Sequence, residues 1–229
     1  MNKVAIVGAQ ELTRDNAPYD DASYEIWGLA DWICYDWLKR CDKLIEVHLA
    51  NIYMNHPRTP DYWDALQNTE IPVYMYPVAD PRIPNSILYP MDGVLGMLAK
   101  GSNGGKKLKP LNCTIAYAIA LAIFLEYDVI DIYGVELAGN AGQYAAQVPH
   151  FAFWDGFALG RGVELNINCS DGLFVQPLYG SEDLTERARL HDYLEALDAD
   201  MRKYQKVLDM TEGAKNVVTK LLYGGEDVI

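Results

Sequence analysis

Basic side chains are scarce in this chain. Lys and Arg number 19 against 32 Asp and Glu in 229 residues, which gives a formal net charge of −13 at pH 7. A surface that follows a nucleic-acid backbone needs clustered Lys and Arg to neutralise the phosphates, and no such stripe occurs. A broad nucleic-acid surface is therefore excluded, and a single local basic spot remains at residues 101–109.

Paired cysteines and membrane-length apolar runs are also missing. The four cysteines show no C-x-x-C spacing, and no charged and apolar leader precedes Val4, so we expect buried thiols in a reducing cytoplasm. The longest strongly apolar run, residues 115–125, is too short to span a bilayer. We therefore expect a cytoplasmic protein that has no membrane partner.

The common phosphate-binding motifs are absent as well. The turn at residues 7–10 lacks the G-x-G-x-x-G spacing of dinucleotide sites, so we do not expect an NAD site. Gly8 in that turn serves either a tight turn or the close approach of a nucleotide to the backbone. Residues 101–107 do not contain G-x-x-x-x-G-K-[ST]. They indicate a solvated loop, and the alternative is a lid whose Lys106 or Lys107 closes over a phosphate.

What the sequence does contain is an alternation of helices and strands. Residues 114–128 predict a helix that is apolar on nearly every face, and the β-branched residues 129–133 predict a strand that ends at Gly134. Further strands are expected at 3–8, 25–28, 43–49, 71–76 and 163–168, and helices at 32–40, 61–67 and 151–161. This order predicts an α/β fold of the Rossmann-like type, a wound and mostly parallel sheet with helices on both faces.

The sequence also predicts a lid and a C-terminal helical appendage. Residues 77–111 carry five prolines, so little regular structure is expected there and the segment is a candidate lid. From Ser181 onwards a long amphipathic helix is predicted by apolar positions three or four apart, namely Leu190, Leu194, Leu197, Met201, Tyr204 and Leu208. We therefore expect a Rossmann-like nucleotide-binding domain, 1–180, and a C-terminal helical extension, 181–229. The apolar stripe packs on its own sheet or pairs with a second copy in a homo-oligomer.

Several candidate site residues follow the strand at 129–133. Such sheets bind ligands outside the carboxyl ends of their strands. Glu136 is suited to hold a sugar hydroxyl, a ribose or a metal, or is simply a solvated loop residue. Tyr144 ends a glycine-rich loop that contains Asn140, and its phenol can donate to a phosphate oxygen. His150 is suited to take a proton near pH 7, although a lone histidine is commonly structural.

The start of the apolar helix is a candidate anion site. Free backbone amides and the helix dipole favour negative charge at a helix N-terminus. Asn112 or Thr114 is expected as the N-cap, and a capping role is compatible with phosphate binding.

A metal site is not predicted. Glu46, His48 and His56 suggest metal ligands by residue type, but their spacing matches no closed ligand set. The five tryptophans are expected in core or edge packing rather than as stacking platforms for bases.

The order of these segments resembles the small bacterial sialyltransferases and the related Rossmann-like domains, some of which are similar to pterin pyrophosphokinases. In that family a G-N-G-P-S type turn follows strand one, a T-S-G type helix start binds the nucleotide, and G-I-D-F leads to phosphate-binding tyrosines and a catalytic histidine. The corresponding segments here are Gly8-Ala-Gln-Glu-Leu12, Cys113-Thr-Ile-Ala116 and Gly134-Val-Glu-Leu137. The order of these segments along the chain resembles that of the family over residues 3–177.

The resemblance implies a nucleotide-sugar donor held by Gly8, Asn112 and Thr114, with Tyr144 on its phosphates and His150 as the base that deprotonates the acceptor hydroxyl. Gln10 and Asn140 complete the expected nucleotide site, Glu136 is the second expected catalytic residue, and no cofactor is required besides the donor substrate. The chain departs from the family in its first turn, where Ala9 or Gln10 replaces the Asn. It also lacks the T-S-G serine, only one tyrosine is clearly placed in the loop, and His150 comes sooner after the strand than the family's histidine does.

Residues 24–28, 84–90 and 156–162 are similar to segments of small phage and prophage proteins, which favours the cytoplasm of a bacterium or a phage-infected host. The sequence thus predicts a nucleotide-sugar-dependent, glycosyltransferase-like enzyme whose partner is a small-molecule nucleotide or nucleotide sugar. The alternative is phosphoryl or diphosphoryl transfer, with Glu136 holding Mg²⁺. A third reading is a non-catalytic nucleotide-binding protein of phage origin.

Overall fold

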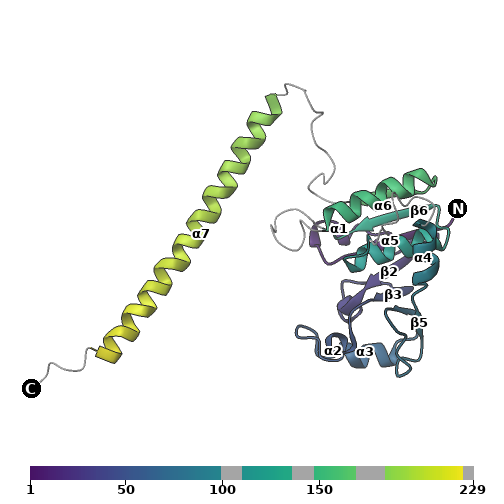
Figure 1. Cartoon of the computed structure of the whole chain (residues 1–229), viewed down its shortest axis with the longest axis horizontal. Coiled ribbons are helices and arrows are strands. Elements are labelled where there is room, and N and C mark those ends of the chain that lie inside the picture. Colours follow the sequence, from purple (N-terminus) through teal and green to yellow (C-terminus); the bar gives the residue numbers. More distant parts are fainter. Residues whose placement is uncertain (99–109, 136–146, 169–183, 224–229) are drawn as a thin grey trace, which may run out of the picture. The chain divides into compact units, whose positions relative to one another are not determined.

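The computed structural model describes residues 1–98, 110–135, 147–168 and 184–223. The chain separates into two compact units, Met1–Phe174 and Val175–Ile229. The sheet and its covering helices belong to the first unit, and one long helix belongs to the second (Figure 1). The expected domain boundary at residue 180 lies outside the described residues and stays a prediction.

The first unit is built on a seven-stranded sheet in the order β5-β4-β3-β2-β1-β6-β7. Every pairing between neighbouring strands is parallel. The predicted α/β fold with a wound parallel sheet is therefore confirmed. The strands are β1 Lys3–Val7, β2 Tyr24–Leu29, β3 Lys43–Glu46, β4 Val73–Met75, β5 Ser86–Leu88, β6 Val129–Tyr133 and β7 Glu164–Asn168.

The chain reverses its direction across the sheet at β1. From β1 it moves outwards through β2, β3 and β4 to β5, and it then crosses back to place β6 on the other side of β1. The strands that follow β1 and β6 in the chain, β2 and β7, therefore lie on opposite sides of this central pair. A topological switch point of this kind is where open parallel sheets bind ligands.

Helices cover both faces of the sheet (Figure 1). On one face Val4, Ile6 and Trp27 pack with α4, α5 and α6, whereas on the other Leu44 and Val73 pack with α2 and α3. Alternate residues of a strand point to opposite faces, which is why these buried strands are apolar throughout. The helices are α1 Glu11–Arg14, α2 Ala50–Tyr53, α3 Tyr62–Asn68, α4 Met91–Leu98, α5 Thr114–Phe124 and α6 Val148–Gly160, with a 3-10 helix, η1, at Ala30–Cys34.

Helix α5 lies in the centre of the larger core. Its alanines, among them Ala116, Ala118 and Ala120, are fully buried, because a small side chain lets the helix lie close to the sheet. The helix ends at Phe124 rather than at residue 128 as predicted. Glu126 adopts a φ of 61°, and this left-handed conformation cannot continue a right-handed helix.

The expectation of little regular structure in 77–111 holds for residues 77–85 and is wrong for most of residues 86–98. Residues 86–88 form β5 and residues 91–98 form α4. Because β5 is the edge strand and pairs only with β4, the prolines around it remove no hydrogen bond from the sheet interior. Pro90 directly precedes α4, where a missing amide proton is tolerated. The remaining candidate lid, residues 99–109, lies outside the described residues.

The helix expected at 32–40 is also wrong. Only η1 is helical there, and residues 35–40 form turns and irregular structure. Contacts with distant residues decide this segment: the guanidinium of Arg14 lies 4.7 Å from the centre of the Trp37 ring, and Arg40 donates to the Tyr19 carbonyl oxygen at 3.1 Å. These tertiary contacts override the local helical pattern.

The second unit contains helix α7, Leu184–Tyr223, which confirms the predicted C-terminal helix. All six apolar positions of its predicted stripe are exposed on the single chain. Among the helices of the described residues, none combines the length and the apolar character needed to cross a bilayer.

Candidate functional site

The carboxyl edge of the sheet carries those predicted site residues that the structure describes, and two glycines are in contact at its switch point. Gly8 follows β1 and Gly134 follows β6, on either side of the switch point. A Cβ atom on Gly8 would lie 2.2 Å from the carbonyl oxygen of Gly134, and a Cβ atom on Gly134 would lie 2.3 Å from that of Gly8. Gly8 is therefore needed because the two turns pack closely together. Of its two predicted roles, a tight turn or the close approach of a nucleotide, this contact supports the first.

The one-turn helix α1 adjoins this contact. The side chain of Gln10 accepts a hydrogen bond from the backbone and caps α1. Arg14 lies with its guanidinium 4.7 Å from the centre of the Trp37 ring. Glu11 and Asp15 approach the same guanidinium at 3.2 and 3.7 Å. The switch point thus carries one cation whose charge is shared by two carboxylates.

The start of α5 is an uncharged helix N-terminus. Cys113, rather than the expected Asn112 or Thr114, occupies the N-cap position, and its side chain makes no capping hydrogen bond. The first turn holds no acidic residue. Burial raises the pKa of the Cys113 thiol, so no thiolate forms there at neutral pH. The positive end of the helix dipole is therefore left to attract an anion.

His150 lies in the first turn of α6. Because α6 connects the carboxyl end of β6 to the amino end of β7, its first turn lies at the carboxyl edge of the sheet. The Nδ1 atom of His150 is buried and has no hydrogen-bond partner in the part of the chain that the structure describes. Among the described residues, no group therefore orients the His150 ring through a hydrogen bond to Nδ1.

The structure thus brings only part of the predicted site to one edge. Gly8, Gln10, Asn112, Thr114 and His150 share the carboxyl edge of the sheet. The other three predicted site residues, Glu136, Asn140 and Tyr144, lie outside the described residues, and their roles stay predictions.

A group of polar side chains that the sequence did not assign to the site lies at the same edge, beyond β2 and β3. We call it the strand-end cluster, and its members are Asp31, Glu46, His48, His56, Thr59 and Tyr62. Glu46, the last residue of β3, is fully buried. It accepts hydrogen bonds from the backbone amide and the Nδ1 of His48, both at 2.7 Å, and from the hydroxyl of Tyr62.

Asp31 is the second buried carboxylate of the strand-end cluster. It accepts a hydrogen bond of 2.6 Å from the Thr59 hydroxyl. The Nδ1 of His56 lies 3.5 Å from Asp31, within ion-pair distance but not aligned for a hydrogen bond. The preceding residue, Ala30, adopts a φ of 49°, a conformation that costs a non-glycine residue about 1–3 kcal/mol. The turn after β2 is therefore held in a strained form that directs Asp31 into the cluster.

The predicted absence of a metal site stays a prediction, although the fold brings some of the residues of this type together. Glu46 and His48 do lie together, as do Asp31 and His56, but no group of three His, Cys, Asp or Glu side chains suited to a metal occurs among the described residues. The sequence signal that was available is the Glu-x-His pattern, in which Glu46 ends β3 and His48 follows two residues later. For Asp31 there was no local signal.

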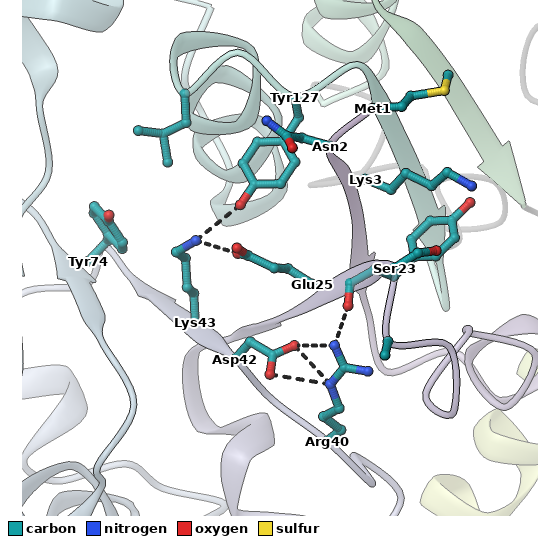
Figure 2. A pocket seen from close by; sticks show the side chains of 13 residues that line it. Met1, Asn2, Lys3, Ser23, Glu25, Arg40, Asp42, Lys43, Tyr74 and Tyr127 are labelled. Atoms are coloured by element: carbon teal, nitrogen blue, oxygen red, sulfur yellow. Dashed lines mark hydrogen bonds and ion pairs between the residues drawn. The ribbon is translucent and has the colours of Figure 1, made fainter.

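A pocket of about 770 Å³ lies at the opposite, amino edge of the sheet (Figure 2). It is lined by the starts of three strands, at Lys3, Tyr24 and Lys43. Two of its cations are paired with carboxylates, Lys43 with Glu25 and Arg40 with Asp42 at 2.8 Å, and the ammonium group of Lys3 lies 5.1 Å from the centre of the Tyr24 ring. Parallel sheets bind ligands at their carboxyl ends, so we do not assign the function to this pocket.

No protein-family model and no curated protein matches the sequence. Among solved structures, the α-2,3-sialyltransferase Cst-I from Campylobacter jejuni aligns with a TM-score of 0.46 and 13% identity over 75% of this chain and 77% of that chain. The sialyltransferase CstII from the same organism, in complex with cytidine-5'-monophosphate, gives 0.44 and 14% over 75% and 81%. Thiamine pyrophosphokinase from Bacillus subtilis gives 0.40 and 12% over 72% and 59%. At these values the likeness concerns the arrangement of helices and strands.

Proposed function

We propose that this chain is a transferase whose donor is a nucleotide sugar. The observation that carries the proposal is the start of α5, where the N-cap residue Cys113 is neutral and no acidic side chain occupies the first turn. This helix end lies at the carboxyl edge of a parallel sheet, the edge at which such folds bind their ligands. A phosphate group of a nucleotide sugar fits the positive end of the helix dipole at this position.

The proposed reaction breaks the bond between the anomeric carbon of the donor sugar and the phosphate oxygen, and the phosphate leaves with the electron pair. A base accepts the proton of the acceptor hydroxyl as the new bond to carbon forms. Among the predicted site residues, the proposal places the donor on Gly8, Gln10, Asn112, Thr114, Asn140 and Tyr144, with Glu136 at the reacting sugar and His150 as the first candidate for the base.

Thermal-shift measurements on the full chain test the donor. The panel contains nucleoside mono- and diphosphates and their sugars, and it starts with cytidine monophosphate and its sugars, since CstII binds cytidine-5'-monophosphate. A ligand at 100 times its dissociation constant adds about 2.7 kcal/mol to the stability of the folded state. At least one panel member should raise the melting temperature. A flat panel would remove the proposal and favour a ligand that is not a nucleotide.

A pair of variants at Cys113 tests the position of the phosphate. Ser and Asp are both good N-cap residues, so Cys113→Ser and Cys113→Asp differ mainly in charge. We expect Cys113→Ser to bind the nucleotide like the unmodified chain. Cys113→Asp should weaken binding about 5- to 30-fold, which corresponds to 1–2 kcal/mol of lost dipole interaction. Equal affinities of the two variants, measured by calorimetry, would place the phosphate elsewhere.

A further inference from the structure

The strand-end cluster contains a histidine that is held by a carboxylate. Glu46 and His48 are two residues apart at the end of β3, and the Oε1 of Glu46 lies 2.7 Å from the Nδ1 of His48. Glu46 is also bonded by Tyr62 from α3, so its carboxylate is fixed on both oxygens. Since an ionised carboxylate only accepts hydrogen bonds, the Nδ1 of His48 must donate. The other ring nitrogen, Nε2, is then the one that can accept a proton.

His48 is accessible, whereas the carboxylate that holds it is not. The His48 side chain is 39% exposed and that of Glu46 is 0% exposed. Among the described residues no hydrogen bond involves the Nε2 of His48. A buried acid that orients a half-exposed imidazole is the arrangement that hydrolases use to fix the tautomer of a general base.

The charges around His48 suit proton transfer near neutral pH. The hydrogen bond to Glu46 and, further away, the charge of Asp31 raise the pKa of His48 above its ordinary value of 6.5. The other titratable groups of the strand-end cluster are His56 and Tyr62, and burial keeps the pKa of Tyr62 well above its ordinary value, so this phenol stays protonated. A base works best when its pKa lies close to the working pH.

We propose that the Nε2 of His48, oriented by Glu46, is the base that takes the proton from the acceptor hydroxyl. This inference rests on the proposed transferase function, and it assigns the base role to His48 in place of His150, whose Nδ1 has no described partner. The acceptor oxygen gives its proton to His48 and bonds to the anomeric carbon, while the donor phosphate leaves with the electrons of the broken bond. The protonated His48 then returns its proton to water. Glu46 is a positioning residue in this reaction.

Turnover of the donor found by the thermal-shift panel tests the inference. The full chain is mixed with that nucleotide sugar, with water or a sugar panel as acceptor, and the release of nucleotide is followed. His48→Gln should lower the rate by about 10²-fold or more, with the nucleotide-induced thermal shift unchanged. His150→Gln is the comparison variant, because a loss of turnover in it alone would identify His150 as the base. Asn51→Ala, at an exposed position of the neighbouring helix α2, is the matched control and should leave the rate unchanged.

The pH dependence separates a positioning role of Glu46 from a merely structural one. A base is active only when unprotonated, so the rate of the unmodified chain should rise with pH through the raised pKa of His48. Without the carboxylate this pKa falls, so Glu46→Gln should move the rise of the rate to lower pH, and histidine NMR titration should give the same direction. Glu46→Asp should restore part of the original profile.

The outcomes distinguish the two proposals. Full turnover in His48→Gln, or loss of turnover in His150→Gln alone, overturns the role of His48 and leaves the transferase standing. Binding of donors without any turnover by the unmodified chain also removes the base role. A flat nucleotide panel removes the proposed function and, with it, this inference.

Discussion

At the scale of single residues, Gly8 and Gly134 are the most constrained positions of the candidate site edge. Gly8→Ala would place a methyl group 2.2 Å from a backbone oxygen, and backbone yields less readily than a flexible side chain. We expect this variant to lower the free energy of unfolding by about 1–3 kcal/mol, the usual cost of overpacking, as measured by chemical denaturation.

Gly96→Ala is the matched control for this change. Gly96 lies in α4, and a Cβ atom there would have no heavy atom within 4 Å. Alanine in a helix interior is more favourable than glycine by about 0.5–1 kcal/mol, so this variant should be slightly more stable than the unmodified chain. A Gly8→Ala variant of unchanged stability would contradict the close contact of the two turns.

Residue types alone were an incomplete guide to the site. Residue type alone suggests a site at Glu46, His48 and His56. Only the fold shows that Glu46 is buried and accepts hydrogen bonds from the Tyr62 hydroxyl and from the Nδ1 of His48. The position of Asp31 shortly after a strand is common for an aspartate and did not identify it as a site residue. Its burial comes from the left-handed turn at Ala30 and from Thr59, which is 28 residues further along the chain.

At the scale of elements, α7 has an apolar stripe of coiled-coil type. Its six positions alternate in steps of four and three residues from Leu190 to Leu208, the spacing of the two apolar positions of a heptad repeat, which favours pairing with another helix. All six are exposed in the single chain. We expect the full chain to self-associate through this face, with a mass by light scattering above the 25.7 kDa of one chain.

Substitutions on the two sides of α7 test this expectation. Leu197→Glu combined with Leu208→Glu puts charges into the apolar seam and should give a monomer. Ala199→Glu, on the opposite side of the helix, should keep the mass of the unmodified chain. If the double variant keeps the oligomeric mass as well, the stripe does not mediate association.

Elements with a strong pattern were predictable, and short ones were not. The β-branched residues of β6 and the apolar surface of α5 make these elements predictable, because most of their residues are buried. In contrast β5 has three residues, sits at the sheet edge among prolines and is half or fully exposed. Its pairing with β4 is what makes it a strand, and that partner is not visible in its own sequence.

At the scale of the whole molecule, the first unit holds the whole described sheet and the three described hydrophobic clusters. We therefore expect a chain that ends at Gly180 to fold by itself. It should unfold cooperatively on heating and keep the nucleotide-induced thermal shift, while its far-ultraviolet circular dichroism loses the contribution of α7. Loss of cooperative unfolding would show that the first unit needs the C-terminal helix.

The sequence by itself determined the wound parallel sheet, the central buried helix and the long C-terminal helix. A buried strand or helix needs a continuous run of apolar residues, and a helix with one apolar face needs apolar residues three or four positions apart, so both patterns are visible along the chain. Only the tertiary structure decided that Gly8 meets Gly134, that Cys113 is the cap of α5, and that Asp31 and Glu46 are enclosed at neighbouring strand ends. These features depend on contacts between segments far apart in the chain, and no local period encodes such contacts.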